Sequence, residues 1–394
     1  MSGNRVPVGP FHPLLEEAEY FELKVDGETV VDINMEIGWM HRGHEYLSEM
    51  STFTQSIFLV ERICGICSTS HPIACTHAVE DIDNVEIPLR ARYIRTMVGE
   101  LERIHSHLLW MGLAGHFIGY DTVWMWAWKY REPILRMMEI ISGNRNHYGI
   151  MRVGGVSRDV EIDKLPELLT LLNSVETKMH MIAKIANDDP VLKKRLVGVG
   201  ILTKEDARRF CAVGPTSRAS GVRGDIRKDD PTDAYDLVDF NEIVLANGDV
   251  YDKFVLRVLE TLESIKIVRQ CIEKLKTVTG SFWNKVTDVP PGEGCGRYEA
   301  PRGEVFHYMR SDGTNRPIRH KVRAPSYVNI PTYEASCKGI SISDALITLA
   351  AVDPCYCCTE RSMKIKEINN KEVPDLLTTS RDKTEKIRRE VHGL

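Results

Sequence analysis

Long apolar runs are missing from this sequence of 394 residues. No stretch of about 18 apolar residues occurs, so no segment has the composition of a transmembrane helix. The first residues, Met1 to Arg5, also lack the apolar core of a signal peptide. An excess of positive charge is absent too, because the formal net charge is −5. That balance argues against bulk binding to nucleic acid or anionic lipid, and we expect a cytoplasmic protein with no nucleic-acid partner.

Internal repeats and low-complexity segments are also missing. With 43% hydrophobic and 27% charged residues, the chain can bury one large core or two modest ones. We expect a mainly α-helical fold with small β-rich parts, one over residues 1–45 and the other, a β-like insertion, over 290–330. Both belong to one domain over residues 1–361. A polar tail follows at 362–394.

Helical periodicity dominates the middle of the chain. Apolar residues recur at steps of three and four over residues 90–112, about 165–187 and 251–277. Near the N-terminus, two alternating segments flank Asp26-Gly27, which predicts a β-hairpin. A helix is predicted from about Arg42 into the first cysteine turn. Residues 211–250 have little apolar periodicity and many Gly, Asp and Arg residues. They predict a long surface loop, either a docking surface or a simply solvated segment.

Cysteine, in contrast, is abundant. Ten cysteines in a cytosolic protein favour metal or redox chemistry over disulfides. Four of them form two C-x-x-C pairs far apart in the chain, Cys64/Cys67 and Cys355/Cys358, and four thiolates are enough to enclose a soft metal ion. The others are expected to be buried thiols that behave as small hydrophobes: Cys75, Cys211, Cys271, Cys295, Cys337 and Cys357.

Spacing alone leaves open whether the metal is a structural zinc ion or a reactive centre. A closed zinc tetrahedron would use all four thiolates. A structural zinc ion, however, usually stabilises a small local unit, whereas this chain has a large core of its own. Each pair is also accompanied by polar side chains that a structural zinc site does not need. These are Arg62 and His71 at the first pair, and Asp353 and Arg361 at the second. Such neighbours tune a reactive metal.

Longer strings around both pairs resemble a known family. The strings similar to nickel–iron hydrogenase large subunits are Arg62-x-Cys64-Gly65-x-Cys67-x-x-x-His71, Glu299-Ala300-Pro301-Arg302-Gly303 and Asp353-Pro354-Cys355-x-x-Cys358. Those similar to the subset shared with the complex I quinone-site subunit are Gly9-Pro10-x-His12-Pro13, Ile37-Gly38-Trp39-Met40-His41-Arg42-Gly43 and Ser106-His107-Leu108-Leu109-Trp110. The resemblance spans nearly the whole chain, and it implies that the tail at 362–394 is either retained or removed on maturation. It indicates the catalytic large subunit of a membrane-associated, energy-converting hydrogenase and implies that family's helical-bundle core.

The resemblance implies a nickel–iron centre. Cys64 and Cys355 would bind nickel terminally, and Cys67 and Cys358 would bridge nickel to an iron that carries carbon monoxide and cyanide. Soft thiolates suit both metals and lose their protons on binding. Cys357 is an open alternative to Cys358 in a C-x-C register, although C-x-x-C matches the first pair and the family.

The resemblance also assigns residues around the metals. Arg302 would project over their open face and pair with a cyanide, and Ser326 would occupy the family's other cyanide-contacting position. His71 would hydrogen-bond a bridging sulfur. Asp353 would pair with Arg302 or its neighbours. Without the resemblance, Arg302 in its Pro-Arg-Gly turn would be interpreted as a structural ion-pair partner.

Proton transfer follows from the same chemistry. Heterolytic cleavage of H2 releases a proton, which the terminal thiolate of Cys355 or the Arg302 guanidine would accept and a nearby acid would relay. Glu17, four residues after Pro13, aligns with the family's relay glutamate. Taken alone, Glu17 would be interpreted as a solvated loop carboxylate.

The implied assembly is larger than this chain. No cysteine cluster is left for an iron–sulfur centre, so an iron–sulfur small subunit must deliver the electrons. The resemblance further implies ferredoxin as the indirect donor, other complex I-like hydrophilic subunits and an ion-pumping membrane arm. These partners would hold the chain at the cytoplasmic side of the cell membrane. Two alternatives stay open: reduction of another acceptor such as a sulfur compound, and a non-catalytic connector with a zinc staple.

Overall fold

The computed structural model describes residues 4–13 and 15–359, two short strands, β9 (Glu367–Ile368) and β10 (Lys371–Glu372), and single positions at 378, 382, 383, 385, 386 and 389. The chain forms one compact unit up to Glu360, and the residues from Arg361 form another. The tail expected at 362–394 therefore lies mostly outside the described residues. Within the described residues, no helix combines the length and apolarity needed to cross a bilayer.

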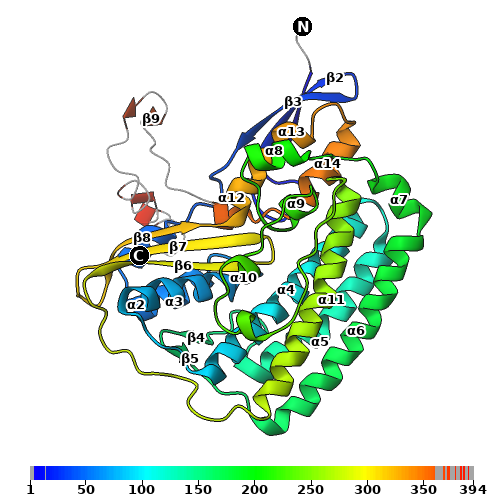
Figure 1. Ribbon diagram of the computed structural model, residues 1–394. Coiled ribbons are helices and arrows are strands. Elements are labelled where there is room, and N and C mark those ends of the chain that lie inside the picture. The colour runs from blue at the N-terminus through cyan, green and yellow to red at the C-terminus, as the bar shows by residue number, and fades with distance from the viewer. Residues whose placement is uncertain are drawn as a thin grey trace. The chain divides into compact units, whose positions relative to one another are not determined.

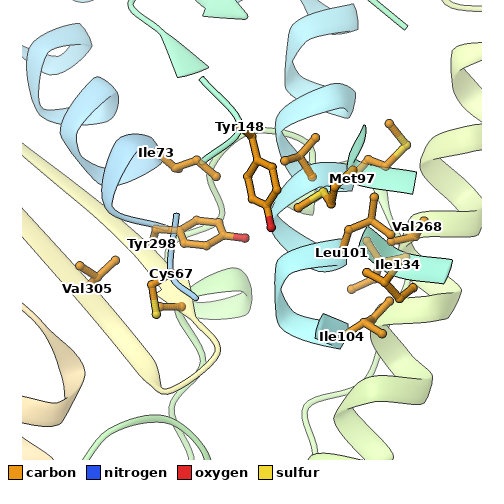
Figure 2. Close-up of a cluster of buried hydrophobic side chains, with 14 of the residues drawn as sticks. Cys67, Ile73, Met97, Leu101, Ile104, Ile134, Tyr148, Val268, Tyr298 and Val305 are labelled. Atoms are coloured by element: carbon orange, nitrogen blue, oxygen red, sulfur yellow. The ribbon is translucent and has the colours of Figure 1, made fainter. Parts of the chain in front are cut away.

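Long helices form the core of the first unit. They are α4 (Leu89–Phe117), α5 (Asp121–Ser142), α6 (Leu165–Asp188) and α11 (Val250–Leu275). Helix α4 packs against α5 and α11, and α6 packs against the same two (Figure 1). Figure 2 shows Met97, Leu101 and Ile104 of α4 beside Ile134 of α5 and Val268 of α11. This helical core with small sheets confirms the predicted fold class, and its apolar stripes follow the predicted periodicity.

Two antiparallel three-stranded sheets accompany the helices. The first contains β1 (Asn4–Val8), β2 (Tyr20–Asp26) and β3 (Thr29–Glu36), and the second contains β6 (Gly292–Ala300), β7 (Gly303–Ser311) and β8 (Pro317–Arg323), each in sequence order. Gly27 turns between β2 and β3 with φ of 60°, which confirms the hairpin predicted there. Pro301 and Arg302 form the β6–β7 turn, because Ala300 pairs with Gly303. Arg302 therefore projects from the end of a hairpin.

Helix α3 (Ser70–Asp83) lies directly on the second sheet, where it contacts β6 and β7 (Figure 1). Gly294 and Gly296 allow this approach, because a Cβ at these positions would come within 2.1 Å and 1.9 Å of the carbonyl oxygens of Ala78 and Ala74. Their lack of side chains brings the first turn of α3, which carries His71, next to β7.

One predicted helix is divided in two. The sequence predicts a single helix from about Arg42 into the first cysteine turn, but the structure has α1 (His44–Glu49) and α2 (Phe53–Glu61). Thr52 begins α2 with a capping box, in which its side chain accepts from the Gln55 N–H and the Gln55 side chain accepts from the Thr52 N–H. This reciprocal cap starts a new helix.

The prediction of a surface loop at 211–250 is wrong. That segment contains short helices, and Arg218, Asp225 and Arg227 are at most 3% exposed. These three side chains are buried because they pair with one another and with carboxylates from other elements, a tertiary effect that local polarity cannot reveal. The remaining elements are β4 (Met151–Arg152), β5 (Gly155–Val156), α7 (Pro190–Leu196), α8 (Lys204–Arg209), α9 (Gly214–Arg218), α10 (Ile226–Asp229), α12 (Pro325–Asn329), α13 (Tyr333–Ser336), α14 (Ile342–Ala351), α15 (Tyr356–Thr359) and the 3-10 turns Ile162–Lys164, Tyr235–Leu237 and Ile330–Thr332.

Candidate metal centre

The two cysteine pairs converge in one buried cluster. Cys64 follows α2, Cys67 precedes α3, and Cys355 and Cys358 lie just before and within α15; each is 4% exposed. The Sγ atom of Cys355 lies 3.3 Å from that of Cys64 and 2.6 Å from that of Cys358. We call these residues, together with Arg302 and Asp353, the cysteine centre.

Side chains from two other elements hold the first cysteine turn in place. Arg42 donates to the carbonyl oxygen of Ile63 at 2.6 Å, directly before Cys64. At the start of α3, the N–H of Ser70 donates to a Glu102 carboxylate oxygen at 3.0 Å. The buried Glu102 carboxylate thus satisfies a free N–H at the start of α3, just after the C-x-x-C turn.

Burial limits the negative charge that the sulfurs can carry without a cation. Burial raises the pKa of the Cys358 thiol well above its usual value. The pKa of Cys64 is held well below its usual value, first because the Cys355 thiol hydrogen-bonds to it. Without a cation, the cluster therefore favours one thiolate, at Cys64, beside thiols that keep their protons. A divalent cation would allow further thiols to ionise, and sulfur ligands select a soft metal over a hard one.

Arg302 and Asp353 form a buried pair beside the sulfurs. The Arg302 guanidinium donates to the Asp353 backbone oxygen at 2.7 Å and to its Oδ1 at 2.6 Å. Its Nη1 also donates to Cys67 Sγ at 3.5 Å and to Ser106 Oγ at 3.1 Å. Asp353 is 1% exposed, its φ is 59°, and its Oδ2 has no hydrogen-bond partner. Such an unsatisfied buried oxygen is costly and is typical of a site that binds a further group.

Ser326 and Glu17 contact the second cysteine pair. Ser326 Oγ accepts the N–H of Cys355 at 3.0 Å, and Glu17 Oε2 accepts the N–H of Cys357 at 2.6 Å. Burial raises the pKa of the Glu17 carboxyl, which brings it closer to the range of a proton-transferring acid. An open groove of about 630 Å³, lined by Phe11 among others, reaches Glu17. Glu17 therefore lies between the sulfur cluster and an opening toward solvent.

A chain of histidines leaves the cluster in another direction. His71 Nε2 lies 3.4 Å from Cys358 Sγ, and its Nδ1 lies 3.1 Å from His307 Nε2. His307 Nδ1 lies 2.9 Å from His320 Nε2, and His320 Nδ1 lies 2.6 Å from Ser48 Oγ. All three rings can hydrogen-bond in series when each carries its proton on the same nitrogen, Nδ1 or Nε2. Sequence analysis identified only His71, because β7 and β8 bring the other two rings together solely through their pairing.

A separate group of buried charges lies outside the cysteine centre. Arg218 contacts Glu260 at 2.7 Å and Glu299 at 2.8 Å, and Arg227 contacts Glu100 at 3.2 Å. Burial opposes ionisation of Glu100, but the guanidinium groups of Arg103 and Arg227 outweigh it and lower the pKa of Glu100 to about 2. The arginine–carboxylate network consists of Glu100, Arg103, Arg218, Asp225, Arg227, Glu260 and Glu299.

Comparison with known proteins defines the class to which this fold and centre belong. The family model of the respiratory-chain NADH dehydrogenase 49 kDa subunit matches residues 118–288 and 281–361, and that of nickel-dependent hydrogenase matches residues 42–113. The chain belongs to this family of membrane-associated hydrogenase large subunits and related complex I subunits.

Individual relatives cover the chain almost completely. Membrane-bound hydrogenase subunit alpha of Pyrococcus furiosus is 37% identical over 99% of this chain and 95% of its own length. The carbon monoxide-induced hydrogenase of Rhodospirillum rubrum is 36% identical over 92% of this chain and 100% of its own length. A subunit of the archaeal membrane-bound sulfane sulfur reductase has a similar structure, with a TM-score of 0.87 and 30% identity over 91% of this chain and 99% of that subunit.

Proposed function

We propose that this chain is the catalytic subunit of an energy-converting membrane complex that reversibly reduces protons to H2 at a nickel–iron centre. The observation that carries the proposal is the convergence of Cys64, Cys67, Cys355 and Cys358 beside the Arg302 guanidinium. Relatives that are membrane-bound and carbon monoxide-induced hydrogenases support it. This donor set suits soft transition metals.

In this proposal, Cys64 and Cys355 would hold nickel, and Cys67 and Cys358 would hold nickel and iron together. When bound, the metals, with carbon monoxide and cyanide on iron, would supply the redox chemistry that cleaves or forms H2. Ser326 Oγ, 3.0 Å from the Cys355 backbone nitrogen, orients that ligand and would contact a cyanide. His71 hydrogen-bonds Cys358 and stabilises its negative charge.

Arg302 and Glu17 have distinct roles in proton handling. Asp353 holds the Arg302 guanidinium against Cys67 and keeps it protonated, so the Cys355 thiolate is the group that accepts the proton from H2. Glu17 then relays this proton toward the groove, since its carboxylate contacts the backbone beside Cys358 and its raised pKa favours exchange. The reverse order delivers protons for H2 formation.

Electrons must come from another subunit. In the described part of the chain, the other group of ligand-type side chains, Cys75, His307 and His320, lacks the thiolates that an iron–sulfur cluster uses. We therefore propose an iron–sulfur small subunit as the direct donor and ferredoxin as the indirect one. Complex I-like hydrophilic subunits and a membrane arm would couple the reaction to ion transport at the cytoplasmic side of the membrane.

Reduction of a sulfur compound is the second candidate. It is favoured by the structural similarity to the sulfane sulfur reductase subunit. Hydrogen–deuterium exchange by the intact complex, measured alongside reduction of a sulfane sulfur substrate, separates the two. Exchange without sulfur reduction is the expected result, and sulfur reduction without exchange contradicts H2 chemistry.

Metal analysis tests the centre itself. The purified complex should contain one nickel and one iron attributable to this chain, with infrared bands of cyanide and carbonyl ligands. One zinc per chain without these bands would identify a structural site and refute the proposed catalytic function.

A further inference from the structure

A fifth thiol belongs to the same sulfur cluster. Cys357 is 6% exposed, and its Sγ lies 3.5 Å from that of Cys355. The sulfur atoms of Cys64, Cys355, Cys357 and Cys358 all lie within 4.8 Å of one another. This set of four includes Cys357 in place of Cys67. The sequence left two roles for Cys357, a buried thiol or a ligand in place of Cys358, and neither puts it in one set together with Cys358.

The dimensions of this second set suit one metal ion. A tetrahedral ion with metal–sulfur bonds of about 2.3 Å places its sulfurs about 3.8 Å apart. The Cys64–Cys355 distance of 3.3 Å and the Cys355–Cys357 distance of 3.5 Å are close to that spacing. The Cys355–Cys358 pair at 2.6 Å has to open by about an ångström, which a small rotation of either side chain achieves.

The two alternative sulfurs have different surroundings. Cys67 accepts a hydrogen bond from Arg302, whose guanidinium is held in place by Asp353. Cys357 has its backbone N–H bonded to Glu17. Cys67 is therefore tied to a fixed guanidinium, whereas the Cys357 sulfur lies among the other sulfurs, 3.5 Å from that of Cys355.

Buried positive charge offsets part of the charge of a single ion bound by four thiolates. A divalent ion with four thiolates carries a net charge of two minus, and two buried guanidinium groups lie nearby. One belongs to Arg302 and is paired with the Asp353 carboxylate, and the other belongs to Arg257, whose Nε has no hydrogen-bond partner. Arg257 Nη2 donates to the backbone oxygen of Val352 at 3.4 Å, directly before Asp353, so its charge lies near the centre.

We propose that, in the chain that lacks iron, Cys357 joins Cys64, Cys355 and Cys358 to bind one soft divalent cation in a closed four-thiolate site. Each thiol still protonated releases its proton to solvent when the cation binds. Because all four positions are filled by protein, the bound ion has no open position for a substrate. The site is thus a loading or storage site for one ion, and it does not depend on which reaction the mature centre catalyses.

Cadmium binding tests this proposal without requiring any activity. The full-length chain, expressed without iron-site maturation, is titrated with Cd²⁺ alone, and sulfur ligands are counted by X-ray absorption and by thiolate charge-transfer absorbance. The unmutated chain should show four sulfurs per cadmium. Cys357→Ser should show three and lose about a quarter of the absorbance. Cys67→Ser and the exposed-thiol control Cys211→Ser should both retain four.

The opposite pattern overturns the proposal. If Cys67→Ser loses a sulfur ligand and Cys357→Ser retains four, the ion uses the two C-x-x-C pairs only. A labelling experiment on the unmutated chain covers the case in which a variant does not fold. Cadmium should protect Cys357 from a small thiol reagent and leave the reactivity of Cys67 unchanged, and protection of Cys67 with no protection of Cys357 would refute the proposal.

Discussion

The arginine–carboxylate network and the cysteine centre are both buried and rich in ionisable groups, but they differ in how completely these groups are paired. In the network, Arg218 contacts two carboxylates, and paired guanidinium groups lower the pKa of Glu100 to about 2. In the centre, Asp353 Oδ2 has no partner and burial raises the pKa of Cys358. A network whose charges are paired is complete within the polypeptide, so the loss of one partner is costly. A cluster with unsatisfied groups is arranged for a ligand that the polypeptide does not supply.

Removing a metal ligand gives the largest expected effect. Cys355→Ser should abolish H2 turnover, because the serine hydroxyl is a poor ligand for a soft metal at this position. The complex should still assemble, since the substitution is isosteric and leaves the network intact. Turnover and nickel content of the purified complex are measured together. Unaltered turnover would remove Cys355 from the catalytic centre.

Neutralising the relay acid gives a smaller loss. Glu17→Gln retains a side chain that can accept the Cys357 N–H but cannot exchange a proton, so turnover should fall by about 10²-fold or more. Nickel content should not change, which separates a proton-transfer defect from loss of the centre. Glu22→Gln, at a residue on β2 that pairs with Arg5, is the matched control and should leave turnover unchanged. A loss equal to that of Glu17→Gln would point to a general charge effect.

Breaking the network should affect stability rather than chemistry. Arg218→Met leaves Glu260 and Glu299 without their shared guanidinium, and removal of one partner from a buried ion pair costs about 3–5 kcal/mol. The free energy of unfolding is measured by chemical denaturation. Arg136→Met, which removes an exposed pair with Glu139, should change it by less than about 1 kcal/mol. Equal losses in the two variants would contradict the distinction between the regions.

Acid should weaken the network through Glu100. The pKa of Glu100 is lowered from 4.5 to about 2 in the folded chain, so its contribution is fully present above the unfolded value. That contribution, up to about 3 kcal/mol, is lost as pH falls from about 4.5 toward 2. Glu100→Gln should flatten the pH dependence of unfolding in this window. An unchanged slope would show that Glu100 is not held ionised by the arginines.

Sequence alone determined most of the helical core and which cysteines meet. The periodic segments at 90–112 and 251–277 correspond to α4 and α11. They could be predicted because apolar residues at steps of three and four mark the buried face of a helix. The cysteine strings could be recognised because metal ligands are set by residue type and spacing. In the same way the residues expected beside them, among them Arg302, Asp353 and Glu17, all lie at the sulfur cluster.

Only the tertiary structure decided which polar residues are buried and how they meet. The segment at 211–250 looks solvated, yet its arginines complete an internal network with carboxylates of α4, α11 and β6. His307 and His320 join His71 only because β7 and β8 pair in one register beside α3. Cys357 enters the sulfur cluster through the turn into α15. Burial of a charge depends on partners distant in the chain, and no local pattern encodes them.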